Sequence, residues 1–282
     1  MTSARFPSPP GELPYAEVIG DPIEHSKSPV IHGFWLGKLG LAGDYRRQRV
    51  SRSELPAYLA ARRDDSRWRG CSVTMPLKLD ALMAAERRSD GAIQAGACNL
   101  LIPHEGGLLA KNTDIGAVTT VIARLAANRT TGSITVLGSG GAARAVLVAC
   151  KRMGMERIAI HARNAAEARS LELAFDLTLP AQAMEAEIAT DGLINATPLG
   201  MARQPPLNVD LGAMPRNGWV FDLVSNPART PLVQEAERRG LAASRGLSML
   251  VEQASEAFTY LFGSEPPRDA ESEAELMRRL VG

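Results

Sequence analysis

Cysteine is scarce in this chain, with three residues among 282 at positions 71, 98 and 150. An odd number without paired spacing argues against a disulfide framework and against a zinc site. Cys71 and Cys98 lie in apolar runs, so they are predicted to be small core residues rather than nucleophiles. The four histidines show no metal-ligand spacing either, and the sequence predicts no bound metal.

Long apolar runs and excess charge are missing as well. No apolar run reaches about 18 residues, which predicts that no segment spans a membrane. Residues 1–14 are proline-rich and lack the apolar core of a signal peptide, so a loose tail and a cytoplasmic location are expected. The net charge is +1, which argues against a nucleic-acid partner and favours a small-molecule substrate. The sequence leaves monomer and homodimer open.

Short apolar strands alternate with amphipathic helices along most of the chain. This alternation predicts an α/β protein with parallel sheets covered by helices. Residues 98–112 are expected to form a hairpin that turns at Gly106 and Gly107. The predicted strands cover residues 15–20, 44–50, 69–73, 134–137, 157–161, 192–195 and 219–223. The predicted helices cover residues 29–39, 53–63, 76–87, 114–127 and 248–262.

The stretch ITVLGSGGAARAVLVAC, residues 134–150, has the pattern of a dinucleotide-binding turn. A buried strand leads into Gly138, Gly140 and Ala143, spaced as G-x-G-x-x-A, and an apolar helix follows. The first glycine permits the tight turn, the second lets a pyrophosphate approach the backbone, and the small third residue lets helix and strand pack closely. The helix N-terminus then offers amides and a positive dipole to the phosphates.

The end of the next predicted strand indicates which dinucleotide is bound. A carboxylate there would hold a free ribose 2′-hydroxyl, whereas an arginine suits a 2′-phosphate. The strand end in IHARNAAEAR carries Arg163 and no acid. The sequence therefore favours NADP(H) over NAD(H).

The stretch GCSVTMPLK, residues 70–78, places Lys78 near the start of a helix. The helix macrodipole disfavours a cation at this end, so this position is unfavourable for a lysine and calls for an explanation. Two further stretches carry candidate polar groups. Ser26 and Ser28 precede a predicted helix and could receive a carboxylate, or serve only as caps. Asp114 is either a helix N-cap or an acid with a chemical role.

Eight stretches in this order resemble the shikimate dehydrogenases. They are IGDPIEHSKSPVIH, GCSVTMPLK, AGACN, KNTDIG, VLGSGGAAR, INATPLGM, FDLVSNPARTPL and MLVEQASEAF. The resemblance runs from Val18 to Phe262. The resemblance implies the reversible NADPH-dependent reduction of 3-dehydroshikimate to shikimate in aromatic amino-acid biosynthesis. It also implies a substrate-binding domain over residues 1–113, completed by helices in residues 247–282, and a Rossmann NADP-binding domain over residues 114–246.

The family's functional residues carry over to matching positions. The resemblance implies that Lys78 and Asp114 form the catalytic pair. The expected substrate contacts are Ser26, Ser28, Thr74, Lys78, Asn99, Asp114 and Gln253. The expected cofactor contacts are Gly138, Gly140, Gly141, Ala142, Ala143, Arg163, Thr197, Leu223, Gly246 and Met249.

Some positions depart from the family pattern. Ser72 stands where asparagine is usual, and Ser225 where tyrosine is usual. Both departures touch the expected substrate pocket, and changed polar contacts to a polyol can change substrate preference strongly. A relative acting on quinate or another shikimate-like carboxylate therefore remains an alternative. A non-catalytic NADP-binding regulator is a second one, against which the presence of Lys78 and Asp114 argues.

Overall fold

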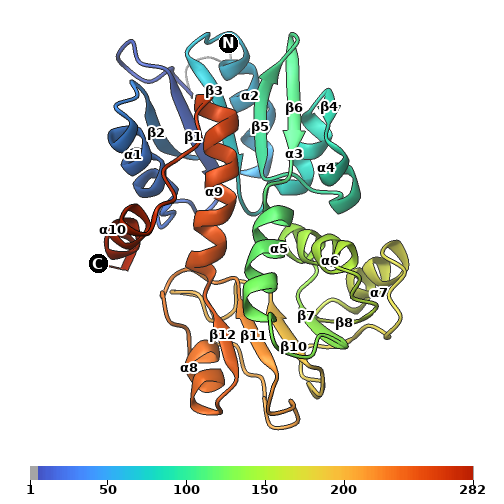
Figure 1. Ribbon diagram of the computed structural model, residues 1–282. Helices are drawn as coiled ribbons and strands as arrows, with labels where there is room; N and C mark the ends of the chain where they lie inside the picture. Colours follow the sequence, from blue (N-terminus) through green and yellow to red (C-terminus); the bar gives the residue numbers. More distant parts are fainter. Residues whose placement is uncertain (1–5, 282) are drawn as a thin grey trace. The chain divides into compact units, whose positions relative to one another are not determined.

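The computed structural model describes residues 6–281 (Figure 1). The chain divides into two compact units, residues 1–113 with 253–282 and residues 114–252. The first junction follows Thr113, and the second lies inside helix α9 (Gly246–Phe262). The expected second boundary, at residue 247, would fall near the beginning of that helix. Within the described residues, no helix is long and apolar enough to cross a membrane, and no cluster of potential metal ligands occurs.

The first unit contains a mixed six-stranded sheet. The strand order is β2 (Asp44–Arg49), β1 (Tyr15–Gly20), β3 (Trp68–Val73), β5 (Leu100–His104), β6 (Gly107–Lys111) and β4 (Arg87–Arg88). The pairs β2–β1, β1–β3 and β6–β4 are parallel, whereas β3–β5 and β5–β6 are antiparallel. The helical segments are α1 (Ser28–Leu39), η1 (Arg52–Glu54), α2 (Leu55–Arg63), α3 (Lys78–Ala84), α4 (Asp90–Ala95), α10 (Ala270–Val281) and the C-terminal part of α9.

Alternate residues of β1 pack against helices on opposite faces of this sheet. Tyr15 and Ile19 join a core cluster with residues of α2 and α3. Ala16 and Val18 join another cluster with residues of α9. Figure 1 shows α9 in front of β1, β3 and β5, with α2 and α3 behind. Because both faces are covered, all six residues of β1 are buried, as is usual for parallel strands.

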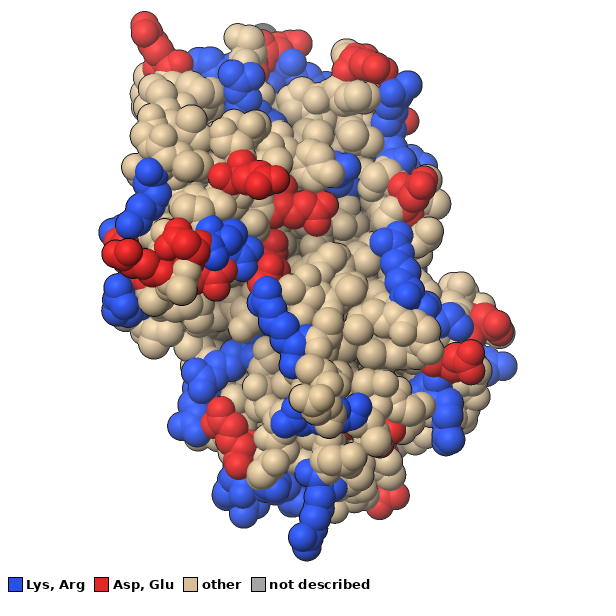
Figure 2. Space-filling model, viewed as in Figure 1, with Lys and Arg blue, Asp and Glu red and all other residues tan. Residues whose placement is uncertain are grey.

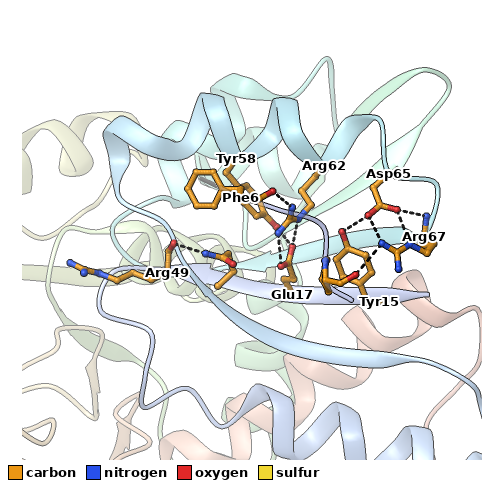
Figure 3. Close-up of polar contacts among 10 residues, drawn as sticks. Phe6, Tyr15, Glu17, Arg49, Tyr58, Arg62, Asp65 and Arg67 are labelled. Atoms are coloured by element: carbon orange, nitrogen blue, oxygen red, sulfur yellow. Dashed lines mark hydrogen bonds and ion pairs between the residues drawn. The ribbon is translucent and has the colours of Figure 1, made fainter. Parts of the chain in front are cut away.

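A buried ion pair lies on the α2 face of β1 (Figure 3). Arg62 Nε and Nη2 donate to the two carboxylate oxygens of Glu17 over 2.8 and 3.0 Å, and Tyr58 adds a hydroxyl donor at 2.7 Å. Arg62 Nη1 also donates to the carbonyl of Phe6, whose ring is buried in the core. The expected loose tail is therefore wrong for the segment that begins at Phe6. Residues 1–5 of that expectation lie outside the described residues.

The second unit contains a six-stranded sheet that is parallel throughout. Its strand order is β12 (Ala242–Ser244), β11 (Trp219–Asp222), β10 (Gly192–Asn195), β7 (Ser133–Leu137), β8 (Arg157–Ala162) and β9 (Gln182–Ala183). Its other helices are α5 (Asp114–Leu125), α6 (Gly141–Arg152), α7 (Ala165–Ala174) and α8 (Pro231–Arg238). Numbered within the unit, this is the Rossmann order 3-2-1-4-5-6, which reverses between β7 and β10.

Several predicted boundaries move by a few residues. The hairpin turns at Glu105 and Gly106, both with positive φ, and Gly107 already belongs to β6. Helix α3 covers Lys78–Ala84 rather than residues 76–87, so Pro76 precedes it. Asp114 is the first residue of α5 rather than a flanking cap. The predicted core role of Cys71 and Cys98 is confirmed, since both are buried, and Cys150 is buried as well.

Charged side chains of both signs are interspersed over the face of the molecule drawn in Figure 2. Charged residues of the protein form surface ion pairs, such as Arg49 with Asp21 and Arg239 with Glu235. Exposed pairs of this kind contribute little to stability, because solvent and salt screen them. The near-zero net charge thus corresponds to a surface on which charges of both signs are mixed.

Candidate active site

Lys78 is positioned by the backbone on both sides of it. The preceding segment is fixed by the Thr74 amide, which donates to the carbonyl of Ile19 over 2.9 Å. Leu77, directly before the lysine, is fully buried. The Lys78 carbonyl accepts a hydrogen bond from the Cys98 amide at 2.9 Å. This bond brings the start of α3 beside the AGACN segment, while the lysine side chain is half-buried.

Asn99 connects two other parts of the predicted substrate site. Its Oδ1 accepts from the Thr113 amide over 2.7 Å, and its Nδ2 donates to Thr113 Oγ1 over 2.8 Å. Nδ2 also lies 3.4 Å from Oε1 of Gln253 on α9. All three side chains are buried. Because Asp114 follows Thr113 directly and is itself buried, the two bonds fix the backbone that leads into it.

Ser26 and Ser28 lie together where α1 begins. The Ser28 amide donates to Ser26 Oγ over 3.3 Å, and Ser28 is the first residue of the helix. The N-cap position belongs to Lys27, which makes no side-chain cap bond. Arg47 on β2 donates from Nε and Nη2 to the carbonyl of Ser26 over 2.8 and 2.5 Å. Two hydroxyls, a helix N-terminus and a guanidinium thus meet here, and their chemistry suits a carboxylate.

Ser72 has a buried partner that the sequence did not predict. The hydroxyl of Tyr45 on β2 donates to Ser72 Oγ over 2.7 Å, and both residues are buried. Burial raises the pKa of the Tyr45 hydroxyl, which therefore stays protonated as a donor. The Ser72 hydroxyl is thus hydrogen-bonded to another side chain in the interior of the first unit. Ser225, the other departure, is half-buried after β11.

The glycine-rich turn lies at the carboxyl end of β7. Gly138 has φ of +108°, and a Cβ there would lie 3.2 Å from the Ala196 carbonyl oxygen. Gly140 is the N-cap of α6, and a Cβ on it would meet nothing within 4 Å. Ala143 in the first turn of α6 is fully buried. The turn therefore leaves open space beside Gly140 and the first amides of the helix, as a pyrophosphate requires.

The other predicted cofactor residues lie at the ends of the neighbouring strands. Gly246 approaches Leu223 so closely that a Cβ would lie 2.3 Å from its carbonyl oxygen. Thr197 follows β10, and its amide and hydroxyl both donate to Asn195 Oδ1. Met249 is buried in the first turn of α9. Thr197, Leu223 and Gly246 thus follow β10, β11 and β12, on one side of the point where the strand order reverses. Such a point is the usual ligand crevice of these sheets.

A buried polar network supports these strand ends, and sequence reasoning missed it. Asp222 accepts from Asn195 Nδ2 over 2.9 Å, from Thr230 Oγ1 over 2.6 Å and from the Val224 amide over 3.0 Å. Burial raises the pKa of the Asp222 carboxyl, which these three donors oppose. Asn195, Asp222 and Thr230 all occur in the stretches that carried the resemblance, so their positions were available but their contacts were not.

Arg163 directly follows β8, and its side chain is exposed. Asn164 caps α7 by accepting from the amides of Ala166 and Glu167. Arg144 in the first turn of α6 is half-buried, and its Nε has no hydrogen-bond partner within residues 6–281. Burial lowers the pKa of this guanidinium, while the nearby Glu167 carboxylate raises it. Two guanidinium groups, the open turn and the helix amides together fit a phosphorylated dinucleotide.

The chain is similar to several known proteins. A family model for the shikimate dehydrogenase substrate binding domain matches residues 18–101. A shikimate dehydrogenase (NADP(+)) from Sphingopyxis alaskensis is 44% identical over 94% of this chain and 97% of its own length. The corresponding protein from Methylobacterium radiotolerans is 39% identical over 95% of this chain and 98% of its own. The crystal structure of shikimate 5-dehydrogenase from Thermus thermophilus in complex with NADP(H) and shikimate superposes with a TM-score of 0.83 at 33% identity, covering 94% of this chain and 99% of that one.

Proposed function

The chain belongs to the shikimate dehydrogenase family, and we propose that it catalyses the reversible NADPH-dependent reduction of 3-dehydroshikimate to shikimate. It is thus an NADP-dependent oxidoreductase acting on a CH–OH group. The observation that carries the proposal is the full-length similarity to relatives of that activity, together with the presence of Lys78 and Asp114. The open glycine-rich turn, Arg144 and Arg163 supply the chemistry that NADPH needs.

Each substrate group has candidate partners in the first unit. We assign the substrate carboxylate to Ser26 and Ser28, supported by their position at the start of α1. Thr74, Asn99 and Gln253 are assigned to the ring hydroxyls, since amide and hydroxyl groups both donate and accept. The Asn99–Gln253 contact supports this assignment because it holds two of the three side chains in one place.

The chemical step needs a hydride and a proton. Bound NADPH supplies the hydride from its nicotinamide ring. Lys78 provides the proton to the ketone oxygen during reduction and takes it back from the hydroxyl during oxidation. Its ammonium group stabilises the negative charge that develops on this oxygen. Asp114 is assigned as the second acid/base group of the proton transfer, held through the neighbouring Thr113.

The test is a turnover assay with purified protein in which shikimate and quinate are each combined with NADP and NAD. Turnover of shikimate with NADP is expected to be the fastest combination. Lys78→Met should lower kcat with shikimate by about 10²–10⁴-fold, which is the usual contribution of acid/base catalysis. Lys38→Met is the matched control, because Lys38 lies on α1 and pairs with Glu275 at the surface. Faster turnover of quinate, or full activity of Lys78→Met, would contradict the proposal.

A further inference from the structure

Glu167 contacts the glycine-rich turn directly. Ser139 lies between Gly138 and Gly140, and its hydroxyl donates to Glu167 Oε2 over 2.7 Å. The Glu167 backbone is fixed in the first turn of α7, since Asn164 Oδ1 accepts from its amide over 3.2 Å. The Glu167 carboxylate is thus held at the glycine-rich turn after β7, although Glu167 itself belongs to α7, which follows β8.

This location matters because of what a dinucleotide presents there. In a sheet of this order, the connection after the second strand meets the adenosine ribose. A carboxylate there accepts from a free 2′-hydroxyl, whereas an arginine binds a 2′-phosphate. This chain has both groups on one connection, with Arg163 directly after β8 and Glu167 four residues later.

The charge around Glu167 is mixed rather than cationic. Glu167 interacts electrostatically with Arg144, whose Nε is buried and has no hydrogen-bond partner among the described residues. A 2′-phosphate bound by Arg144 and Arg163 would share this region with the Glu167 carboxylate. Two anions side by side repel, and this repulsion offsets part of the attraction to the two guanidinium groups.

We propose that Glu167 sets the cofactor specificity of the enzyme by accepting a hydrogen bond from the ribose 2′-hydroxyl of NAD(H) and repelling the 2′-phosphate of NADP(H). The inference rests on the proposed function in so far as NADPH occupies this same turn. The enzyme consequently binds NAD(H) as a second cofactor, and its preference for NADP(H) is smaller than Arg144 and Arg163 alone would produce. Ser139 acts through Glu167 by holding the carboxylate toward the turn.

The test compares Glu167→Gln with wild type, because the amide keeps the size of the side chain and removes its charge. Dissociation constants for NADPH and NADH are measured by fluorescence titration without substrate, followed by kcat/KM for NADP and NAD with shikimate. The dissociation constant for NADH divided by that for NADPH is expected to rise about tenfold. This is the size of the effect of losing one charge-assisted hydrogen bond. The kcat/KM ratio should move in the same direction.

Glu156→Gln is the matched control, since Glu156 is exposed and directly precedes the opposite end of β8. It should leave both ratios at the wild-type values. A wild-type ratio in Glu167→Gln, or an equal shift in Glu156→Gln, would overturn the role of Glu167. Absence of shikimate turnover would contradict the proposed function alone, because the two dissociation constants are measured without substrate.

Discussion

The hydroxyl of Tyr45 donates to the hydroxyl oxygen of Ser72 across 2.7 Å inside the first unit. The two residues are 27 positions apart and lie on β2 and β3, which are both neighbours of β1. Ser72 is one of the residues at which this chain departs from its family pattern. The hydrogen bond from Tyr45 makes Ser72 one member of a buried polar pair. We therefore expect Ser72 to contribute to the stability of the first unit.

Removing either hydroxyl of this pair is expected to destabilise the protein. Tyr45→Phe and Ser72→Ala should each lower the free energy of unfolding by about 1–3 kcal/mol, because each leaves a buried polar group without its partner. The double variant should cost less than the sum of the two, with a coupling of about 1 kcal/mol. Urea unfolding of the four proteins measures this coupling, and additive costs would contradict the pair.

The Asn99–Thr113 bonds are expected to matter for the position of Asp114. Thr113→Val keeps the shape of the side chain but removes the hydroxyl that Asn99 Nδ2 contacts. We expect kcat with shikimate to fall about tenfold with little change in KM, since misplacement of a catalytic group acts on the chemical step. Thr119→Val is the control, because the Thr119 hydroxyl donates back to the Ile115 carbonyl within α5. Equal losses in both variants would refute a positioning role.

Two glycines of the second unit, Gly140 and Gly246, should respond differently to substitution by alanine. Gly140 has φ of −79° and open space where a Cβ would stand, so Gly140→Ala should cost about 1 kcal/mol or less in stability. It should nevertheless weaken NADPH binding about tenfold, because the new methyl group fills the approach of the pyrophosphate. In Gly246→Ala the Cβ would clash with the backbone of Leu223 and Val224. We therefore expect Gly246→Ala to lower the free energy of unfolding by about 1–3 kcal/mol, more than Gly140→Ala does.

Thermal or urea unfolding and NADPH titration together distinguish the two glycines. Undiminished NADPH affinity in Gly140→Ala would argue against a pyrophosphate at this turn.

His32 should make stability depend on pH. The ring is fully buried, stacks on Tyr45 with centroids 3.9 Å apart, and neither nitrogen has a hydrogen-bond partner within the described part of the chain. Burial lowers the pKa of the imidazole from 6.5 to about 3. Between these values the unfolded chain binds more protons than the folded one, so the free energy of unfolding rises with pH.

The expected loss from this histidine is about 2 kcal/mol on going from pH 6.5 to about pH 4.5. His32→Leu should remove that part of the pH dependence, whereas His25→Leu, at an exposed position, should retain it. Urea unfolding at the two pH values gives the comparison. An unchanged slope in His32→Leu would show that other groups cause the acid sensitivity.

Local sequence patterns determined much of this protein. The strand, glycine-rich turn and apolar helix at residues 134–150 could be recognised because the backbone requirements of such a turn are met by adjacent residues. Tyr15–Gly20 and Gly192–Asn195 were predicted at their observed bounds, and the other strands and helices that were predicted lie within a few residues of theirs. The family pattern then supplied candidate site residues that periodicity alone could not distinguish from caps and surface groups.

Partners far apart in the sequence were decided by the tertiary structure. Asn99 meets Gln253 across 154 positions, Arg62 meets Glu17 across 45, and Ser139 meets Glu167 across 28. Whether such side chains meet depends on strand order, on register and on the face to which each residue points, and none of these is encoded in a local window. The acid near Arg163 illustrates the limit, because Glu167 was visible in the sequence but only the fold brings it to the turn.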